Sequence, residues 1–275
     1  MKTLIRLFLV AAIAAFSPGS AFAKSAPLRI MPLGDSITDG TSAGTAGRGG
    51  YRGPLYDSLT TAGYNVDYIG TLSNNGALLA DVNHEGHGGW RIDQHDANIE
   101  GWFNTMEDPD VVLMHIGTND FGQSLDITNA INRFDALILK IATLRPYAHI
   151  IVTNLMARAE PRNTEIQTHF NPFVEDRVDA HALAGRRVTF LDMRAAVPIT
   201  DMPDNLHPNQ AGYDKMAAAW LPAIQAVIGV DGDSVAPVVV RARGVTDATQ
   251  VKITFSKPVA DSAANIANYA RSAAA

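Results

Sequence analysis

Between residues 28 and 230, short uninterrupted apolar runs alternate with segments in which apolar residues recur at helical spacing. Five runs are apolar at nearly every position, which is typical of parallel strands covered on both faces. They span residues 28–33, 66–70, 111–116, 149–153 and 188–191. Helical periodicity is found in segments 53–62, 92–103, 127–145, 173–184 and 210–228. This alternation predicts an α/β fold, a doubly wound three-layer α/β/α sandwich with a five-stranded parallel sheet in flavodoxin-like order.

The first 23 residues have the pattern of an export signal. Lys2 and Arg6 precede an apolar run from Leu7 to Phe16, and the small-x-small segment 21–23 is typical of a signal-peptidase site. The run is short for a transmembrane helix, although an uncleaved anchor is the alternative interpretation. We therefore predict a signal peptide over residues 1–23, a secreted or periplasmic protein, and no membrane insertion after cleavage.

The pattern changes again after residue 229. Segments 237–243 and 250–255 resemble strands, and the second alternates apolar with polar residues as a half-buried strand does. They look like the opening hairpin of an immunoglobulin-like sandwich, which needs about 100 residues. We therefore predict a catalytic domain over residues 24–229, followed over residues 230–275 by a linker and a truncated immunoglobulin-like β module.

Composition narrows the chemistry. The chain has no cysteine, which excludes a thiol nucleophile and disulfides. Its net charge is −6, and loss of the two cationic residues of the leader makes it about −8. Nucleic acids and anionic membranes select basic surfaces, so neither is an expected partner.

Candidate site residues follow four of the five predicted strands. Ser36 follows the first strand, Gly89 lies in the loop after the second, Asn119 follows the third, and Asp204 and His207 lie between the fifth strand and the last helix. Ligands of doubly wound sheets bind outside the carboxyl ends of the strands. We therefore expect these five residues to lie at one edge of the sheet.

Each of the five suits a role in acyl transfer. Serine is a weak nucleophile unless a base takes its proton and a third group orients that base. His207 is the candidate base and Asp204 its candidate orienter, while the Ser36 N–H, the Gly89 N–H and the Asn119 amide could bind an oxyanion. Taken separately, Ser36 could lie in an ordinary turn and Asn119 could cap a helix. Together, the five residues favour a serine hydrolase.

These residues also carry a family resemblance. Gly34-Asp35-Ser36, Gly89, Gly117-x-Asn119-Asp120 and Asp204-x-x-His207 resemble the four blocks of the SGNH (GDSL-type) hydrolases. Segments 31–40, 49–52, 84–90 and 115–120 are similar to acetyl xylan esterases of carbohydrate esterase family 3. The resemblance covers residues 28–228 and implies the SGNH fold, a Ser36 nucleophile, a His207 base, an Asp204 orienter and an oxyanion hole of Ser36, Gly89 and Asn119. Gly88 departs from the pattern, which has a small polar residue there.

Further polar residues are candidates for other roles. A dense cluster suggests a metal at first sight, but its spacing is not His-Glu-x-x-His, and a structural or substrate-lining role is favoured. The cluster comprises His84, Glu85, His87, Asp93, His95 and Asp96. We predict no metal and no cofactor. Asp35, Trp90 and Arg52 are candidate substrate-binding residues; Trp90 could stack on a sugar or pack in the core, and Arg52 could instead pair with Asp39.

The predicted function is that of an exported serine esterase. Loops 40–52 and 71–90 are rich in small and polar residues, which favours a short acyl group such as acetyl. An acetylated polysaccharide such as xylan, or a small ester, is the expected substrate. The alternatives are a lipase, lysophospholipase or broad arylesterase of the same fold, an O-acetyltransferase, and a non-catalytic carbohydrate-binding or adhesion module.

Overall fold

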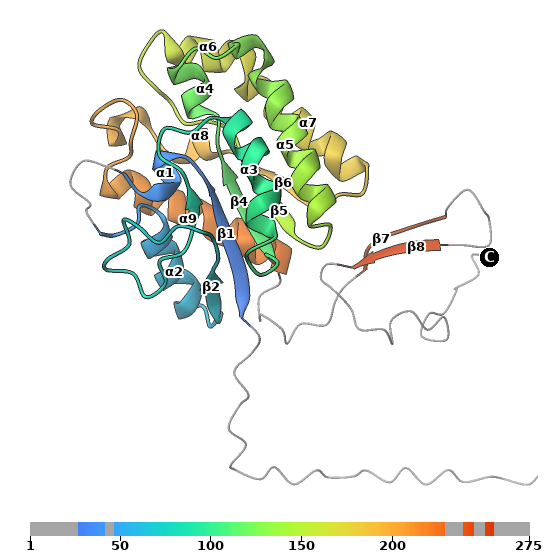
Figure 1. Cartoon of the computed structure of the whole chain (residues 1–275). Coiled ribbons are helices and arrows are strands. Elements are labelled where there is room, and N and C mark those ends of the chain that lie inside the picture. The colour runs from blue at the N-terminus through green and yellow to red at the C-terminus, as the bar shows by residue number, and fades with distance from the viewer. Residues whose placement is uncertain (1–26, 42–46, 229–238, 245–250, 256–275) are drawn as a thin grey trace, which may run out of the picture.

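The computed structural model of the chain describes residues 27–41, 47–228, 239–244 and 251–255. Within the first two ranges, a parallel sheet lies between two layers of helices (Figure 1). Its strands are β1 (Leu28–Gly34), β2 (Val66–Tyr68), β3 (Glu85–Gly86), β4 (Val111–His115), β5 (His149–Thr153) and β6 (Val188–Leu191). The α-helices are α1 (Ser36–Asp39), α2 (Arg52–Thr61), α3 (Ile92–Phe103), α4 (Thr118–Gly122), α5 (Ala130–Leu144), α6 (Arg162–His169), α7 (Asn171–Leu183), α8 (Met193–Ala196) and α9 (Gln210–Ile228). Two 3₁₀ turns, η1 (Ile127–Asn129) and η2 (Ile199–Asp201), complete this part.

The sheet has the flavodoxin-like order β2-β1-β4-β5-β6, with every pair parallel. The five predicted strands are thus confirmed, with ends within two residues of the prediction. A sixth strand, β3, escaped prediction because two residues, Glu85 and Gly86, carry no apolar pattern. β2 pairs with the start of β1, and β3 pairs with its end through Leu33↔Glu85 and Gly34↔Gly86. β3 therefore leads the following loop to the carboxyl end of β1.

Alternate residues of the central strands enter two separate cores. Val112 and Met114 of β4 pack with α3 and α5, whereas Val111 and Leu113 pack on the other face with α2 and α9. Trp220 of α9 is fully buried in the second core. Burial on both faces explains why these strands appear in the sequence as continuous apolar runs.

The helices depart from the prediction where the amphipathic signal is weak or interrupted. The predicted helix 127–145 is divided into the 3₁₀ turn η1 and the α-helix α5, and Asp126, with a left-handed φ of 34°, lies directly before the turn. The helix α6 was not predicted, and Ile166 is its only buried residue. The last helix, α9, continues through Pro222 as one element.

Beyond the sandwich, β7 (Val239–Gly244) and β8 (Val251–Phe255) form an antiparallel pair at the two segments predicted as strands. The rest of the predicted immunoglobulin-like module lies outside the described residues. The predicted signal peptide over residues 1–23 also lies outside them. Both stay predictions. Among the described residues, no helix is both long and apolar enough to span a bilayer.

Candidate active site

Ser36 lies at the tip of a strand-to-helix turn. β1 ends at Gly34, and the Asp35 side chain caps α1 by accepting a hydrogen bond from the Ile37 N–H at 3.0 Å. Ser36 is the first residue of α1 and is partly exposed. A side chain at Gly34 has no room, since its Cβ would lie 2.2 Å from the His115 carbonyl oxygen. The turn thus holds the hydroxyl at the carboxyl edge of the sheet.

The structure brings the three predicted catalytic residues into one chain of hydrogen bonds. Ser36 Oγ lies 2.8 Å from His207 Nε2, and His207 Nδ1 lies 2.7 Å from Asp204 Oδ2. The other carboxylate oxygen of Asp204 accepts from the backbone N–H groups of Leu206 and His207, at 2.9 and 2.6 Å. Because a carboxylate only accepts, Nδ1 carries the ring proton and Nε2 keeps its lone pair for the serine hydroxyl.

These hydrogen bonds also set the charge of Asp204. Partial burial would raise the pKa of this carboxyl, but the backbone N–H and ring of His207 and the Leu206 N–H outweigh that effect. The pKa of Asp204 is therefore below its usual range, and the group is ionised at neutral pH. A negative charge stands ready to stabilise the imidazolium that forms when His207 takes a proton.

Two of the residues predicted to bind an oxyanion lie just after β3 and on α4. The His87 N–H donates to the Gly34 carbonyl at 2.8 Å, which places the next residue beside the nucleophile. A Cβ built on Gly88 would lie 3.9 Å from Ser36 Cβ, and a Cβ on Gly89, whose φ is 80°, meets nothing within 4 Å. Gly88 and Gly89 therefore leave open space next to the serine hydroxyl.

Asn119 reaches the same loop from α4. Its Nδ2 donates to the Trp90 carbonyl at 2.9 Å. A carboxamide has two N–H bonds, so one can hold the loop while the other donates to a ligand. Ser36, Gly89 and Asn119 thus converge at one edge of the sheet, as the strand-end rule predicts.

Two predicted substrate-binding residues need correction, because neither Asp35 nor Arg52 has exposed surface. Asp35 is committed to the cap of α1. Arg52 donates to the backbone carbonyls of Thr38, Asp39, Asn74 and Val82, at 2.7 to 3.2 Å. The charges of Arg52 and Asp39 attract each other, but Arg52 bonds the backbone carbonyl of Asp39, whose carboxylate accepts from the side chains of Thr41, Asn74 and Asn75. A buried guanidinium satisfied by carbonyls ties loops together.

Burial also shifts the titration of Asp35. Desolvation raises the pKa of this carboxyl to about 6, against the opposing effect of the Ile37 N–H hydrogen bond. The buried carboxylate has favourable electrostatic interactions with His207 and with Arg158. Asp35 therefore acts on the site through its charge and its cap rather than by touching a ligand.

The side chains of the polar cluster in residues 84–96 contact one another and neighbouring residues. His87 Nε2 lies 2.6 Å from the buried Glu85 carboxylate, and the His87 ring stacks on both Trp90 and Trp102, with centroid distances of 4.2 and 4.6 Å; the two tryptophan rings also stack on each other at 6.0 Å. His95 is buried with its ring edge-on to all three. In the described part of the chain, no three His, Asp or Glu side chains are grouped as metal ligands. Trp90 stays partly exposed beside Gly89.

One charged neighbour of the site was missed. Arg158 follows β5, and its Nη1 donates to the Thr118 carbonyl at 3.0 Å. Its charge interacts favourably with Asp35 and Asp204. Applied to the fourth predicted strand, the same strand-end rule would have indicated this residue.

Comparison with known proteins agrees with the geometry. Residues 33–215 match the GDSL-like Lipase/Acylhydrolase family. A family 3 carbohydrate esterase from Clostridium thermocellum is 32% identical, with a TM-score of 0.64 over 74% of this chain and 100% of that one. A family 3 carbohydrate esterase from Talaromyces cellulolyticus is 26% identical, with a TM-score of 0.62 over 73% of this chain and 97% of that one.

A curated relative has a larger architecture. A multidomain esterase from Ruminococcus flavefaciens is 29% identical over an alignment of 230 residues, which covers 72% of this chain and 28% of the relative. The chain thus spans well under half of that protein's length. With the family model covering most of the sandwich and the nucleophile, base and orienter within bonding distance, the chain belongs to the GDSL-like lipase/acylhydrolase family and is an esterase.

Proposed function

We propose that this esterase removes acetyl groups from an acetylated polysaccharide such as xylan, through an acyl-enzyme on Ser36. The observation that carries the proposal is the hydrogen-bonded chain from Ser36 through His207 to Asp204, which lies beside two exposed glycines and Asn119.

Acylation follows from the protonation states of this chain. Ser36 Oγ attacks the ester carbonyl carbon while its proton passes to His207 Nε2, and Asp204 stabilises the resulting imidazolium. The carbonyl oxygen becomes an oxyanion that receives hydrogen bonds from the Ser36 N–H, the Gly89 N–H and the Asn119 amide. The tetrahedral intermediate then collapses, the bond to the alcohol oxygen breaks, and Nε2 returns the proton to the departing alcohol.

Deacylation repeats these steps with water. His207 Nε2 takes a proton from water as its oxygen attacks the acyl carbon, and the same donors stabilise the second oxyanion. Collapse breaks the bond to Ser36 Oγ, which regains its proton from Nε2. The acid leaves and the free enzyme is restored.

Two features support a short acyl group on a sugar. The residues next to the nucleophile, Gly88 and Gly89, carry no side chain that could line a long apolar channel, and the half-buried Trp90 beside them is suited to stack on a sugar ring. The solved structures with 25% identity or more include an acetyl esterase and two family 3 carbohydrate esterases. These names describe those proteins and favour the same substrate class here.

The decisive assay is acetate release from acetylated xylan and other acetylated glycans. We expect activity in the wild type and a loss of about 1,000-fold or more in Ser36→Ala. Ser58→Ala is the matched control, because the Ser58 hydroxyl donates to the Pro54 carbonyl within α2, and it should retain full activity. An active Ser36→Ala variant would refute the acyl-enzyme. A wild type that binds the acetylated glycan but releases no acetate would favour a non-catalytic binding module.

A second measurement separates the enzymatic alternatives. Turnover of nitrophenyl esters should fall as the acyl chain lengthens from acetyl to decanoyl. A preference for the long chain would establish the lipase or lysophospholipase alternative. Acetylation of an added acceptor sugar, in place of acetate release, would establish an O-acetyltransferase.

We also propose that the protein is exported. The basic, apolar and small-x-small pattern of residues 1–23 supports this. Expression in a bacterial host followed by N-terminal sequencing of the periplasmic fraction should give a chain that begins at Lys24. A cell-associated chain that retains residues 1–23 would contradict the proposal.

A further inference from the structure

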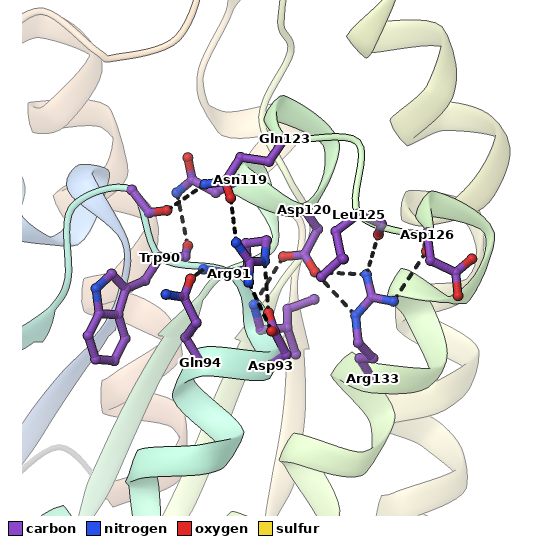
Figure 2. A network of polar contacts seen from close by, with 12 residues as sticks. Trp90, Arg91, Asp93, Gln94, Asn119, Asp120, Gln123, Leu125, Asp126 and Arg133 are labelled. Atoms are coloured by element: carbon purple, nitrogen blue, oxygen red, sulfur yellow. Dashed lines mark hydrogen bonds and ion pairs between the residues drawn. The ribbon is translucent and has the colours of Figure 1, made fainter.

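Three side chains from α4 and the residue that follows it make hydrogen bonds to the backbone between Gly89 and the start of α3 (Figure 2). Gln123 Nε2 donates to the Gly89 carbonyl at 2.8 Å, and Asn119 Nδ2 donates to the Trp90 carbonyl at 2.9 Å. The Asp120 carboxylate accepts from the Ile92 N–H at 3.0 Å. Three side chains within five residues therefore fix this oxyanion loop, residues 88–92.

Asp120 fastens α4 to the rest of the sandwich. Its carboxylate is buried and lies 2.9 Å from Arg133 Nη2, while the same guanidinium donates to the Leu125 and Asp126 carbonyls. Figure 2 shows this arginine on α5, on the far side of Asp120 from the loop. Asn119 has its own role as an oxyanion donor. Both residues are therefore needed for packing or chemistry apart from the loop.

Gln123 is different, because its side chain is exposed and contributes nothing to either core. Its Oε1 accepts from Arg91 Nη1. The Arg91 guanidinium is in turn fixed by the Asp93 carboxylate through two bonds of 3.0 Å. Since a guanidinium only donates, Arg91 forces the amide oxygen of Gln123 towards itself and the amide nitrogen towards Gly89.

The backbone conformation of Gly89 needs to be restrained by its neighbours. Two consecutive exposed glycines have wide conformational freedom, and Gly89 occupies a left-handed φ of 80°. On the amino side, the His87 backbone bond to Gly34 and the stacking of its ring hold the loop. On the carboxyl side, the Gly89 carbonyl is held by Gln123. Oxyanion donors accelerate a reaction only when they are oriented beforehand.

We propose that Gln123, oriented by Arg91, is a positioning residue: by holding the Gly89 carbonyl it restrains the φ and ψ of Gly89 and so keeps the Gly89 N–H directed at the oxyanion. The inference rests on the proposed function, because it assigns a task within the same esterase site. Gln123 touches neither the substrate nor the reacting atoms and acts through Gly89.

The test compares Gln123→Met, which keeps the length of the side chain but cannot donate to a carbonyl, with the wild type. Removing an oxyanion donor costs about 100- to 1,000-fold in kcat, and loosening one should cost less, about 5- to 30-fold. We expect that loss on nitrophenyl acetate with KM changed less than about twofold, because the interaction matters only in the transition state. The affinity for a boronic acid that mimics the tetrahedral intermediate should fall by a similar factor.

Asn132→Ala is the matched control. Asn132 is an exposed amide whose Nδ2 donates to Asn129 and whose Oδ1 accepts from Arg177, so it has the same bonding pattern away from the loop. It should leave kcat unchanged. Arg91→Met should reduce kcat, and the double variant with Gln123→Met should be little worse than Gln123→Met alone, because both act through one bond.

Gln123→Glu gives a signature that a purely structural role would not. At pH 8 its carboxylate cannot donate to the Gly89 carbonyl, so we expect a loss at least as large as in Gln123→Met. At about pH 5 a fraction of the carboxyl is protonated and can donate. The ratio of wild-type kcat to variant kcat should therefore be smaller at pH 5 than at pH 8.

The outcomes are distinguishable. An active wild type with an unimpaired Gln123→Met variant overturns this inference alone, and so does a Gln123→Met variant that loses thermal stability and kcat together. A wild type that hydrolyses no ester overturns the proposed function and this inference with it.

Discussion

Asp35 places a carboxylate in a buried position directly before the candidate nucleophile. Replacing it tests how far that charge lowers the free energy of unfolding. In Asp35→Asn the side chain keeps its shape, and its oxygen can still accept from the Ile37 N–H, since Asn and Asp are equally good helix caps. The variant therefore removes the charge and places an amide nitrogen at the buried position of Oδ2, which has no hydrogen-bond partner among the described residues.

The magnitude follows from the pKa. Burial raises the pKa of Asp35 from 3.8 to about 6. Below about pH 4 the carboxyl is protonated in both the folded and the unfolded chain, so removing its charge does not change the free energy of unfolding. Between about pH 4 and 6 the unfolded chain has released its proton while the folded chain retains it, so wild-type stability falls as pH rises. Above pH 6 the buried charge lowers the free energy of unfolding of the wild type by its full amount, about 3 kcal/mol at most.

We therefore expect Asp35→Asn to raise the free energy of unfolding by about 1–3 kcal/mol at pH 8, with a gain that vanishes towards pH 4. Urea denaturation at intervals between pH 4.5 and 8 measures both stability curves. The exposed Asp57→Asn variant is the control for the chemical change alone. A variant less stable than the wild type at pH 8, or one whose gain is the same at every pH, would refute the reasoning. Activity should fall, because the carboxylate interacts favourably with His207.

Further predictions concern catalysis, substrate binding and packing. Asp204→Asn should lower kcat on nitrophenyl acetate by about 1,000-fold or more, since the amide no longer fixes the His207 tautomer; a loss below tenfold would contradict that role. Trp90→Ala should raise KM for acetylated xylan several-fold while leaving nitrophenyl acetate unaffected, and equal effects on both would exclude sugar stacking. Gly86→Ala should destabilise the fold by about 1–3 kcal/mol, because its Cβ would lie 2.3 Å from the Asp39 nitrogen. Gly101→Ala, in open space within α3, should stabilise it by about 0.5–1 kcal/mol in the same urea assay.

The sheet could be predicted because its physical cause is visible along the chain. Strands buried on both faces require apolar residues at every position, and this pattern located all five long strands. That the candidate catalytic residues would lie together could be predicted because parallel strands end at a common edge, where Ser36 and His207 do meet. The two-residue β3 has no pattern of its own, although it brings the oxyanion loop to that edge.

The charged residues were harder to place. A buried arginine such as Arg52 is satisfied by backbone carbonyls, and every residue has one, so no sequence signal separates it from an arginine that binds substrate. Gln123 illustrates the same problem at the surface. Its bond to Gly89 joins residues 34 positions apart, and it depends on the path of a loop rather than on any periodicity.

The Gly-Asp-Ser segment shows why a short motif can nevertheless carry so much information. Gly34 is required by sterics, because β4 runs too close for any side chain. Asp35 is required by the cap, which begins a helix directly after a strand and buries a charge in doing so. Ser36 alone is required by the proposed reaction. Because each of the three positions answers to a different physical demand, substitutions there should fail in different ways. Gly34→Ala should lose stability at every pH, Asp35→Asn should exchange activity for stability above pH 6, and Ser36→Ala should lose activity in a fully folded protein.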